Sequence, residues 1–281
     1  MGMNCKPDKR QLTRRLIEIV GKDAVLADER ELVVYECDAY TLQRNPPTAV
    51  VLPRSTQEVA AVVRLCAEMD VPIIPRGAGT GLSGAVLAVD GGVMIALTRM
   101  NRVLNIDPRN RRALVEAGCV NAWITRDAAQ HGLFYAPDPS SQTACTIGGN
   151  IATNSGGPHT LKNGVTTNHV IGLEVVLEDG TVVNLGSLAR ETPGYDLRGV
   201  FTGSEGTFGM ATRILVRLLP LPEAVKTYLG VFRDIESACT AVSTVIGHGI
   251  VPAALEIMDA TAIRAVQQSM DAGYPEDAGA V

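Results

Sequence analysis

The stretch Arg76-Gly-Ala-Gly-Thr-Gly-Leu-Ser-Gly-Ala85 comes directly after an apolar run at residues 71–75. Two more glycine-rich stretches occur further along the chain, Thr146-Ile-Gly-Gly-Asn-Ile-Ala-Thr-Asn-Ser-Gly-Gly157 and Gly203-Ser-Glu-Gly-Thr-Phe-Gly-Met-Ala-Thr212. Glycine lets the backbone adopt positive φ and come close to a ligand, and consecutive N–H groups in such turns form a concave anion site. One such loop can bind a phosphate. Three of them predict a single long ligand that is bound at several points along its length.

Composition limits the class of protein. The chain has 281 residues, of which 46% are hydrophobic, and this allows a large core in one large or two medium domains. The net charge is -5 and only 4% of residues are aromatic, which argues against a nucleic-acid partner. No apolar stretch reaches ~18 residues, so no membrane span is predicted. The six cysteines show no C-x-x-C spacing and no secretory signal precedes them, so we predict reduced thiols in a cytoplasmic protein.

Hydrophobic periodicity predicts a βαβ unit before the first glycine stretch. Residues 9–20 have the pattern of an amphipathic helix, and residues 49–52 that of a short strand. Ser55 opens a helix with a capping box to Glu58, and residues 71–74 form a second strand parallel to the first. The first glycine stretch therefore leaves the C-terminal end of a strand, where ligands usually bind in α/β sheets.

The rest of the chain continues this alternation. A second segment holds strands at 112–117 and 213–219, a helix at 120–131, and a hairpin of strands 172–177 and 181–185. Pro220-Leu-Pro222 is the predicted linker. Beyond it we expect strands at 226–232 and 251–258, which alternate with helices at 235–248 and 260–270.

Two common phosphate-binding motifs do not fit the first glycine stretch. Gly79-Thr-Gly81-Leu-Ser-Gly84 matches the Rossmann pattern G-x-G-x-x-G, but that pattern needs a helix after its third glycine and an acidic residue about 20 positions on. Only residues 85–90 separate Gly84 from the turn at Gly91-Gly92, and residues 93–97 are already a β-rich run. A Walker A site is excluded because no Gly-Lys-Ser/Thr follows any of the three stretches.

Pro75-Arg-Gly-Ala-Gly-Thr-Gly-Leu-Ser-Gly84 resembles the pyrophosphate loop of FAD-linked oxidases of the p-cresol methylhydroxylase and vanillyl-alcohol oxidase type. Among these it is most similar to the glycolate oxidase flavoprotein subunit and the D-lactate dehydrogenase group. Pro137-Asp-Pro-Ser-Ser141 with residues 146–157, then Gly194-Tyr-Asp-Leu197 with residues 203–209, recur in the same order and spacing. The resemblance covers roughly residues 10–270.

The resemblance implies an α+β fold with a two-subdomain FAD-binding domain of the p-cresol methylhydroxylase type. We expect an N-terminal helical segment at 1–45, the FAD-binding domain at 46–222 with subdomains at about 46–110 and 111–222, and an incomplete α+β substrate-binding cap at 223–281. The chain is expected to be C-terminally truncated relative to the family.

The same resemblance implies FAD that lies extended between the two subdomains. The residues expected to hold its pyrophosphate are Arg76, Gly77, Ala78, Gly79, Thr80, Gly81, Leu82 and Ser83. Those expected along the ribityl chain and isoalloxazine are Pro137, Asp138, Ser140, Thr146, Gly148, Gly149, Asn154, Gly156 and Gly157. Those expected towards the adenosine are Glu205, Gly206 and Gly209. FAD binding is predicted to be noncovalent, because relatives that tether the flavin through the first loop use a histidine in it, and residues 76–85 contain none.

The implied reaction is oxidation of a small 2-hydroxy acid of the glycolate or D-lactate type by hydride transfer to flavin N5, with partner subunits as in a glycolate-oxidase-like complex. Such a substrate needs an arginine for its carboxylate and a histidine for its hydroxyl. Relatives supply these groups from the cap, which includes a His-x-Gly-Asp-Gly-Asn-x-His stretch that this sequence lacks. The catalytic residues are therefore unassigned, no metal site is predicted, and the chain is not expected to turn over alone. The alternative is a non-catalytic FAD-binding module or electron-relay subunit.

Several residues keep two interpretations. Asp138 is either a flavin-site residue or the turn residue of Pro-Asp-Pro. His159 either approaches the flavin or is an ordinary loop histidine, and Cys145 is either a reactive group or a small buried hydrophobe. Arg198, which replaces a small polar residue of the family, is either a surface charge or a contact to a flavin phosphate. Asn163 replaces the tyrosine of a family Lys-Tyr-Gly motif, which puts one contact to the flavin ring in question.

Overall fold

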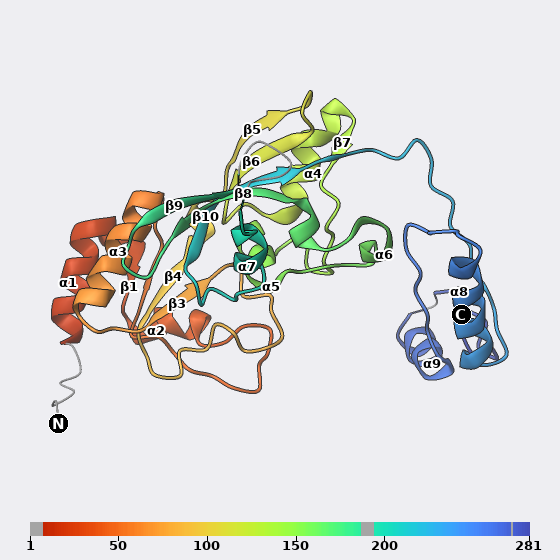
Figure 1. Ribbon diagram of the computed structural model, residues 1–281. Helices are drawn as coiled ribbons and strands as arrows, with labels where there is room; N and C mark the ends of the chain where they lie inside the picture. The colour runs from red at the N-terminus through yellow and green to blue at the C-terminus, as the bar shows by residue number, and fades with distance from the viewer. Residues whose placement is uncertain (1–7, 187–193, 271) are drawn as a thin grey trace.

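The computed structural model of the chain describes residues 8–186, 194–270 and 272–281. Two sheets with their helices form the main body, and an extended stretch leads from it to a smaller unit that holds the C-terminus (Figure 1). Residues 1–7 of the predicted N-terminal segment, with Cys5, lie outside the described residues.

The first sheet is mostly parallel, and its strand order is β1-β2-β4-β3. Its strands are β1 (Val25–Leu26), β2 (Ala49–Val51), β3 (Ile73–Arg76) and β4 (Val93–Ala96). The predicted strands before the glycine stretch are parallel, as expected, but β4 inserts between them and pairs in parallel with both. β1 closes the edge antiparallel to β2. The carboxyl ends of the three parallel strands therefore lie at one edge of the sheet.

Two long helices cover this sheet. They are α1 (Lys9–Val20) and α3 (Thr56–Glu68), with the short α2 (Glu29–Leu32) nearby. α1 packs on α3, and Leu12 and Leu16 share one core with residues of both sheets. The Ser55 hydroxyl caps α3 by accepting from the Glu58 N–H at 3.2 Å, as the capping box predicts. The Glu58 carboxylate accepts from the Arg54 N–H at 2.7 Å, one residue before the expected partner.

The second sheet is antiparallel, and its strand order is β5-β6-β10-β8-β9. Its strands are β5 (Val103–Asp107), β6 (Arg112–Glu116), β8 (Val170–Val176), β9 (Val182–Gly186) and β10 (Met210–Arg217). The predicted hairpin is the β8–β9 pair. β10 comes last in sequence yet lies at the centre, between β6 and β8. The helices of this part are α4 (Asn121–Ala128), α5 (Ile147–Thr153), α6 (Thr160–Asn163) and α7 (Leu197–Phe201), and a small pair joins β7 (Leu133–Phe134) to β11 (Leu219–Pro220).

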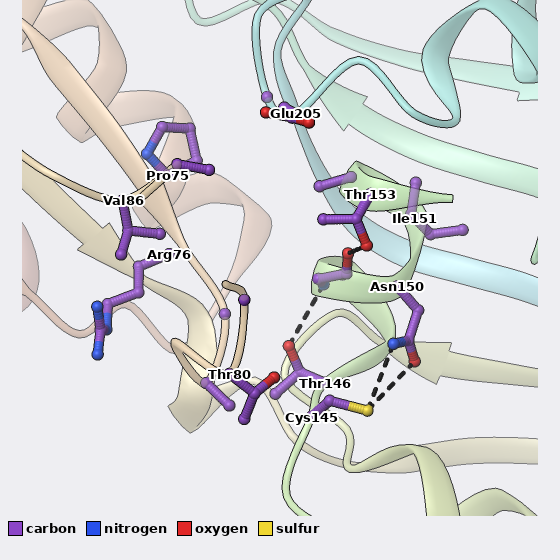
Figure 2. Close-up of a pocket in the computed structure, with 18 of the residues that line it drawn as sticks. Pro75, Arg76, Thr80, Val86, Cys145, Thr146, Asn150, Ile151, Thr153 and Glu205 are labelled. Carbon is purple, nitrogen blue, oxygen red and sulfur yellow. Dashed lines mark hydrogen bonds between the residues drawn. The ribbon is translucent and has the colours of Figure 1, made fainter. Parts of the chain in front are cut away.

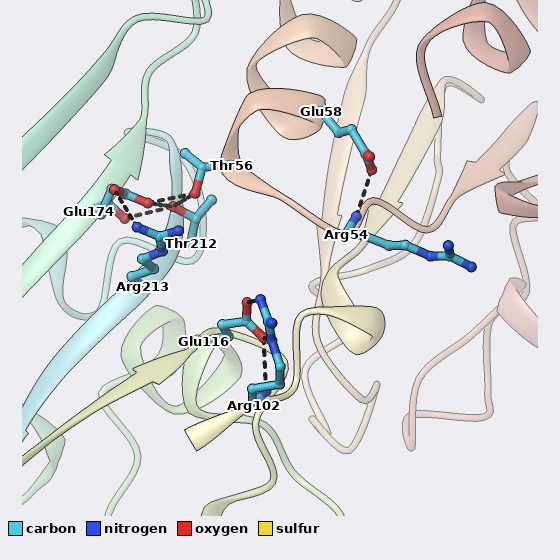
Figure 3. A network of polar contacts seen from close by, with 8 residues as sticks. All are labelled: Arg54, Thr56, Glu58, Arg102, Glu116, Glu174, Thr212 and Arg213. Carbon is cyan, nitrogen blue, oxygen red and sulfur yellow. Dashed lines mark hydrogen bonds and ion pairs between the residues drawn. The ribbon is translucent and has the colours of Figure 1, made fainter. Parts of the chain in front are cut away.

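A buried polar contact joins α3, which packs with the first sheet, to the second sheet (Figure 3). Thr56, at the start of α3, donates its hydroxyl to Glu174 Oε1 on β8 at 2.5 Å and lies 3.1 Å from the Thr212 hydroxyl on β10. Thr212 also donates to Glu174 Oε1, at 3.0 Å, and Arg213 lies 3.6 Å from the other carboxylate oxygen. Thr56 and Thr212 are fully buried. This cluster therefore fixes α3 against the second sheet.

The C-terminal unit differs from the sequence-based expectation. Its helices α8 (Ile235–Gly247) and α9 (Ala260–Ser269) match the predicted ones. The predicted strands at 226–232 and 251–258 are wrong, because those residues have no regular secondary structure and form no ladder with another strand of the described chain. Phe232 and Asp259 each form only an isolated bridge to Ala280. A β-rich run becomes a strand only where another strand pairs with it, and here none does.

Removing the Thr56 hydroxyl should loosen the joint between the sheets. In Thr56→Val the Glu174 carboxylate loses one of its buried donors, and we expect the free energy of unfolding to fall by about 1–3 kcal/mol. Urea denaturation followed by circular dichroism measures the change. Thr56→Ser keeps the hydroxyl and is the control. An equal loss in both variants would show that the methyl group, and not the hydrogen bond, stabilises this contact.

Candidate functional site

The three glycine-rich stretches line one cavity between the two sheets. Its volume is ≈ 350 Å³, within the usual range for small-molecule sites. Figure 2 shows the first stretch on one side, with Arg76 and Thr80, and α5 on the other, with Thr146 and Ile151. Glu205 of the third stretch closes a further side. The cavity thus lies at the carboxyl end of β3.

The first loop lines this cavity and contains unpaired backbone donors. Residues 76–83 all line it. Within the described residues, the N–H groups of 78–83 donate to no other group of the chain. The loop is fixed from its other side, where Ala39 N–H donates to Gly81 O at 3.1 Å and Arg76 Nη1 donates to Cys37 O at 3.1 Å. A row of free N–H groups on a fixed loop is a ready anion site.

The Arg76 guanidinium supports the loop from behind. It lies 5.4 Å from the centre of the Tyr35 ring, in a cation–π arrangement, and in Figure 2 its side chain points away from α5. Burial lowers the pKa of Arg76, and the nearby Tyr35 and Asp38 oppose that shift. A Cβ on Gly79 would overlap this guanidinium, and Gly79 also has φ +74°. Gly79 is therefore required by the loop itself, with or without a ligand.

Two glycines let α5 pack closely on its neighbours. A Cβ on Gly77 would lie 2.5 Å from the Thr146 hydroxyl and 3.5 Å from Gly149 Cα. Thr146 is the N-cap of α5, where its hydroxyl accepts from the Gly149 N–H at 3.4 Å. On the far side of α5, a Cβ on Gly148 would lie 3.0 Å from Ala117 O. Glycine at 77 and 148 thus lets α5 pack between the first loop and the second sheet.

The third stretch docks on the other end of α5. Gly203 N–H donates to Ile151 O at 2.8 Å, and Glu205 N–H donates to Ala152 O at 2.9 Å. A Cβ on Gly206 would lie 2.8 Å from Pro75 Cγ, and its φ is +83°. The third stretch therefore bridges α5 and the strand that carries the first loop.

Most of the predicted site residues line the cavity, and six do not. Those in the lining are Arg76, Gly77, Ala78, Gly79, Thr80, Gly81, Leu82, Ser83, Thr146, Gly148, Gly149, Glu205, Gly206 and Gly209. Those outside it are Pro137, Asp138, Ser140, Asn154, Gly156 and Gly157. Flavin contacts of these six stay a prediction.

The structure gives some of these six residues roles within the protein. Asn154 ends α5 in the left-handed conformation, and its side-chain oxygen accepts from the Thr167 N–H at 3.0 Å. A Cβ on Gly157 would overlap the Asp138 carbonyl, so the two segments touch there. Asp138 Oδ2 lies 2.5 Å from His159 Nδ1, and this carboxylate–histidine pair is partly exposed. Asp138 is thus more than a turn residue, because its side chain orients an imidazole.

The structure also shows where Arg198 and Cys145 lie, the two other residues for which the sequence left two interpretations open. Arg198 is only 21% exposed and donates to the Val170 and Ile171 carbonyls, so it anchors α7 to β8 and is neither a surface charge nor part of the cavity lining. Cys145 is buried in the lining, where its sulfur accepts from Asn150 Nδ2 at 3.3 Å.

Sequence reasoning missed much of the lining. Most of the missed residues lie within or next to the three stretches: Pro75, Ala85, Val86, Asn150, Ile151, Ala152, Thr153, Ser155, Phe201, Met210 and Ala211. Their position beside the glycines was the signal that could have found them. Pro139 and Ser141 belong to the Pro137-Asp-Pro-Ser-Ser141 motif, whereas Asp38, Leu97 and Ala117 come from other segments, and no local pattern marks them.

In the part of the chain that the structure describes, no helix is both long and apolar enough to cross a membrane. No group of three or more His, Cys, Asp or Glu side chains in that part of the chain is arranged to bind a metal ion.

Two family models match the chain. Residues 47–186 match the FAD binding domain, and residues 221–281 match the C-terminal domain of FAD linked oxidases. The chain is 43% identical over 274 residues to the glycolate oxidase subunit GlcD of Escherichia coli K12, covering 98% of this chain and 55% of the relative. It is 36% identical over 250 residues to a D-lactate dehydrogenase of Anaerostipes hadrus, covering 89% and 52%. The chain spans about half the length of the curated relatives it matches.

Solved structures share the fold. p-Cresol methylhydroxylase with bound substrate aligns with a TM-score of 0.72 at 22% identity, over 84% of this chain and 48% of that one. An alkyldihydroxyacetonephosphate synthase aligns with a TM-score of 0.86 at 24% identity, over 97% and 52%. The fold is thus that of a flavin-binding domain of the p-cresol methylhydroxylase type. The chain belongs to the FAD-linked oxidases, and its homologues include glycolate oxidase subunits and D-lactate dehydrogenases.

FAD is the cofactor of this family, and the cavity fits it on chemical grounds. The free N–H groups of residues 78–83 suit a pyrophosphate, and no Cβ blocks their approach at Gly79 and Gly81. The described lining carries no lysine and no histidine, and its one arginine, Arg76, donates to Cys37 O and packs on Tyr35, so backbone dipoles rather than cationic side chains would meet the phosphate charge.

Gly81 offers a clean test of this assignment. Its φ is not positive, and the nearest atom to an added Cβ is Asp38 Oδ2 at 3.7 Å, so the free protein accepts a side chain there. We expect Gly81→Val to fold with the thermal midpoint of the wild-type apoprotein and to purify colourless, because the new methyl groups occupy the approach to the N–H groups. Flavin absorbance per mole of protein measures the loss.

Gly247→Val is the matched control, since that glycine has nothing within 4 Å of an added Cβ and lies in the C-terminal unit. It should keep its flavin. Stoichiometric FAD in Gly81→Val would place the pyrophosphate elsewhere in the cavity.

Proposed function

We propose that this chain is the flavin-carrying part of an FAD-dependent oxidoreductase that oxidises a small 2-hydroxy acid of the glycolate or D-lactate type. The observation that carries the proposal is the cavity at which three separate glycine stretches meet around unpaired N–H groups. The kinship with glycolate oxidase subunits and D-lactate dehydrogenases supports the choice of substrate class.

FAD, when bound, supplies the acceptor for a hydride from the carbon that bears the substrate hydroxyl. The chain's own contribution is to bind and orient the cofactor. The first loop would hold the pyrophosphate through residues 78–83, and α5 with the third stretch would form the opposite wall. Gly77 and Thr146 bring these two walls into contact at the base of the first loop.

The remaining catalytic needs are an anchor for the substrate carboxylate and an acceptor for its hydroxyl proton. Within the described lining the only charged side chains are Asp38, Arg76 and Glu205, and Arg76 is occupied by Cys37 and Tyr35. His159 lies outside the cavity lining, and its Nδ1 is held by the Asp138 carboxylate, so it is the first candidate of this chain for the proton acceptor. No arginine joins it, so we propose that residues 1–281 bind flavin without efficient turnover.

We also propose that the active protein works with partner subunits. Two relatives are named as subunits of a glycolate oxidase, and several apolar side chains of the C-terminal unit and its connecting segment are exposed here. They include Val225, Tyr228, Val231 and Val251, which are all more than half exposed. An exposed apolar surface of this kind is typical of contacts with further protein.

The cofactor should be released intact by acid. Residues 76–85 hold no histidine, and Cys145 is buried with its sulfur on Asn150, so no side chain of the lining is placed to form a flavin bond. After precipitation with trichloroacetic acid we expect all flavin absorbance in the supernatant. Yellow colour retained in the washed pellet would contradict this prediction.

Turnover is tested by reducing the bound flavin without oxygen. Glycolate, D-lactate and D-2-hydroxyglutarate are each added to the holo chain, and flavin bleaching is followed at its visible maximum. We expect bleaching at least about a hundredfold slower than in a version extended through a complete cap, because positioning supplies much of the rate. Dithionite, which needs no substrate site, should bleach both forms equally and is the control.

Equal rates with a hydroxy acid would place the catalytic groups within residues 1–281, with His159 as the first residue to replace. Failure of all three acids to bleach even the extended form would favour a non-catalytic flavin module or an electron-relay subunit.

A further inference from the structure

Asp38 is a buried carboxylate that neither the sequence motifs nor the proposed chemistry accounts for. Its residue is only 6% exposed, and it lines the cavity beside the first loop. Burying a charged group costs free energy unless hydrogen bonds or opposite charge compensate it. The partners of each carboxylate oxygen therefore decide what this residue does.

The two oxygens of Asp38 differ. Oδ1 accepts from the Tyr40 N–H at 2.8 Å and closes a local turn. Oδ2 accepts no hydrogen bond from the described part of the chain, and it lies 3.7 Å from the Cβ position of Gly81. It also lacks an ion pair with Arg76 there, because that guanidinium donates to Cys37 O and packs on Tyr35. One oxygen is thus structural and the other is free next to the phosphate loop.

A free carboxylate oxygen at this place suits a hydroxyl donor and opposes an anion. The N–H groups of residues 78–83 are donors and take the phosphate, so a group that accepts hydrogen bonds beside them suits the next part of the ligand. In FAD, hydroxyl-bearing carbons flank the pyrophosphate on both sides, the ribityl chain on one and the ribose on the other. Carboxylates beside a phosphate loop bind ribose hydroxyls in other nucleotide-binding folds by the same chemistry.

We propose that Asp38 Oδ2 accepts a hydrogen bond from a sugar hydroxyl next to the pyrophosphate and so fixes how the cofactor enters the loop. This inference rests on the proposed FAD function of the cavity. It makes Asp38 a cofactor-positioning residue in the segment before β2, about forty residues ahead of the glycine loop that it serves.

Asp38→Asn tests the proposal without disturbing the turn. The Asn side-chain oxygen still accepts from Tyr40 N–H, while its amide group replaces the free acceptor by a donor. We expect FAD to bind about tenfold or more weakly, since a hydrogen bond to a charged acceptor is lost. Titration of the apoprotein with FAD, followed by flavin fluorescence, gives the dissociation constant, and the thermal midpoint of the apoprotein checks the fold.

Two other outcomes of the Asp38→Asn titration would contradict the proposal. If Asp38 acted only through its charge, removing that charge beside a pyrophosphate would strengthen FAD binding, and if it only closed the turn, binding would not change. Either outcome overturns the proposal. Asp90→Asn removes an equal charge from an exposed position outside the lining and should leave the dissociation constant unaltered.

Smaller ligands identify which hydroxyl is bound. A parallel loss of FMN affinity in Asp38→Asn assigns the ribityl chain, and a parallel loss of ADP affinity assigns the ribose.

Asp38→Ser, which keeps an oxygen for the turn but has no acceptor at the cavity, should repeat the weakening if Asp38→Asn does not fold. A wild-type chain that binds no flavin at all would overturn the proposed function, whereas unchanged binding in the variants would overturn only the role of Asp38.

Discussion

The contact between the first glycine loop and the start of α5 is the constraint on which the site depends. Gly77 lies so close to Thr146 that any side chain there would meet the threonine hydroxyl. The same short helix also touches Ala117 through Gly148 and receives the third stretch at Ile151 and Ala152. Because α5 is packed on three sides, a shift of either sheet would change the width of the cavity. The buried Thr56–Glu174 hydrogen bond opposes such a shift.

The glycines of the three stretches therefore serve two purposes. Some are required by the protein alone: Gly79 leaves room for the Arg76 guanidinium, and Gly206 leaves room for Pro75. At others, above all Gly81, the protein itself has room for a side chain, since the nearest atom to an added Cβ is Asp38 Oδ2 at 3.7 Å. The sequence alone does not distinguish glycines that the protein's own packing requires from glycines that leave room for a ligand, because both are simply Gly in the motif. Only the packing around each position shows which glycines prepare the loop and which leave space for a ligand.

The sequence predicted those elements well whose signals are local. In the main body these are the α3 cap at Ser55 and the β8–β9 hairpin, and in the C-terminal unit they are the helices α8 and α9, which all follow from periodicity and turn chemistry within a few residues. The insertion of β4 between β2 and β3 was not predictable, because strand order depends on long-range pairing. The same holds for the residues at 226–232 and 251–258, whose β-rich pattern lacks a partner, and for Asp38, which reaches the cavity only through the fold.

The central place of β10 has a consequence for how the protein is made. β10 pairs with β6 and β8, yet it is the last strand of that sheet to leave the ribosome. Until it emerges, β6 and β8 are both open edges, which are prone to pair with other chains. The cavity also needs residues from Asp38 to Ala211, so cofactor capture can only follow synthesis of nearly the whole main body. FAD should therefore bind late in synthesis, after β10 has completed the second sheet.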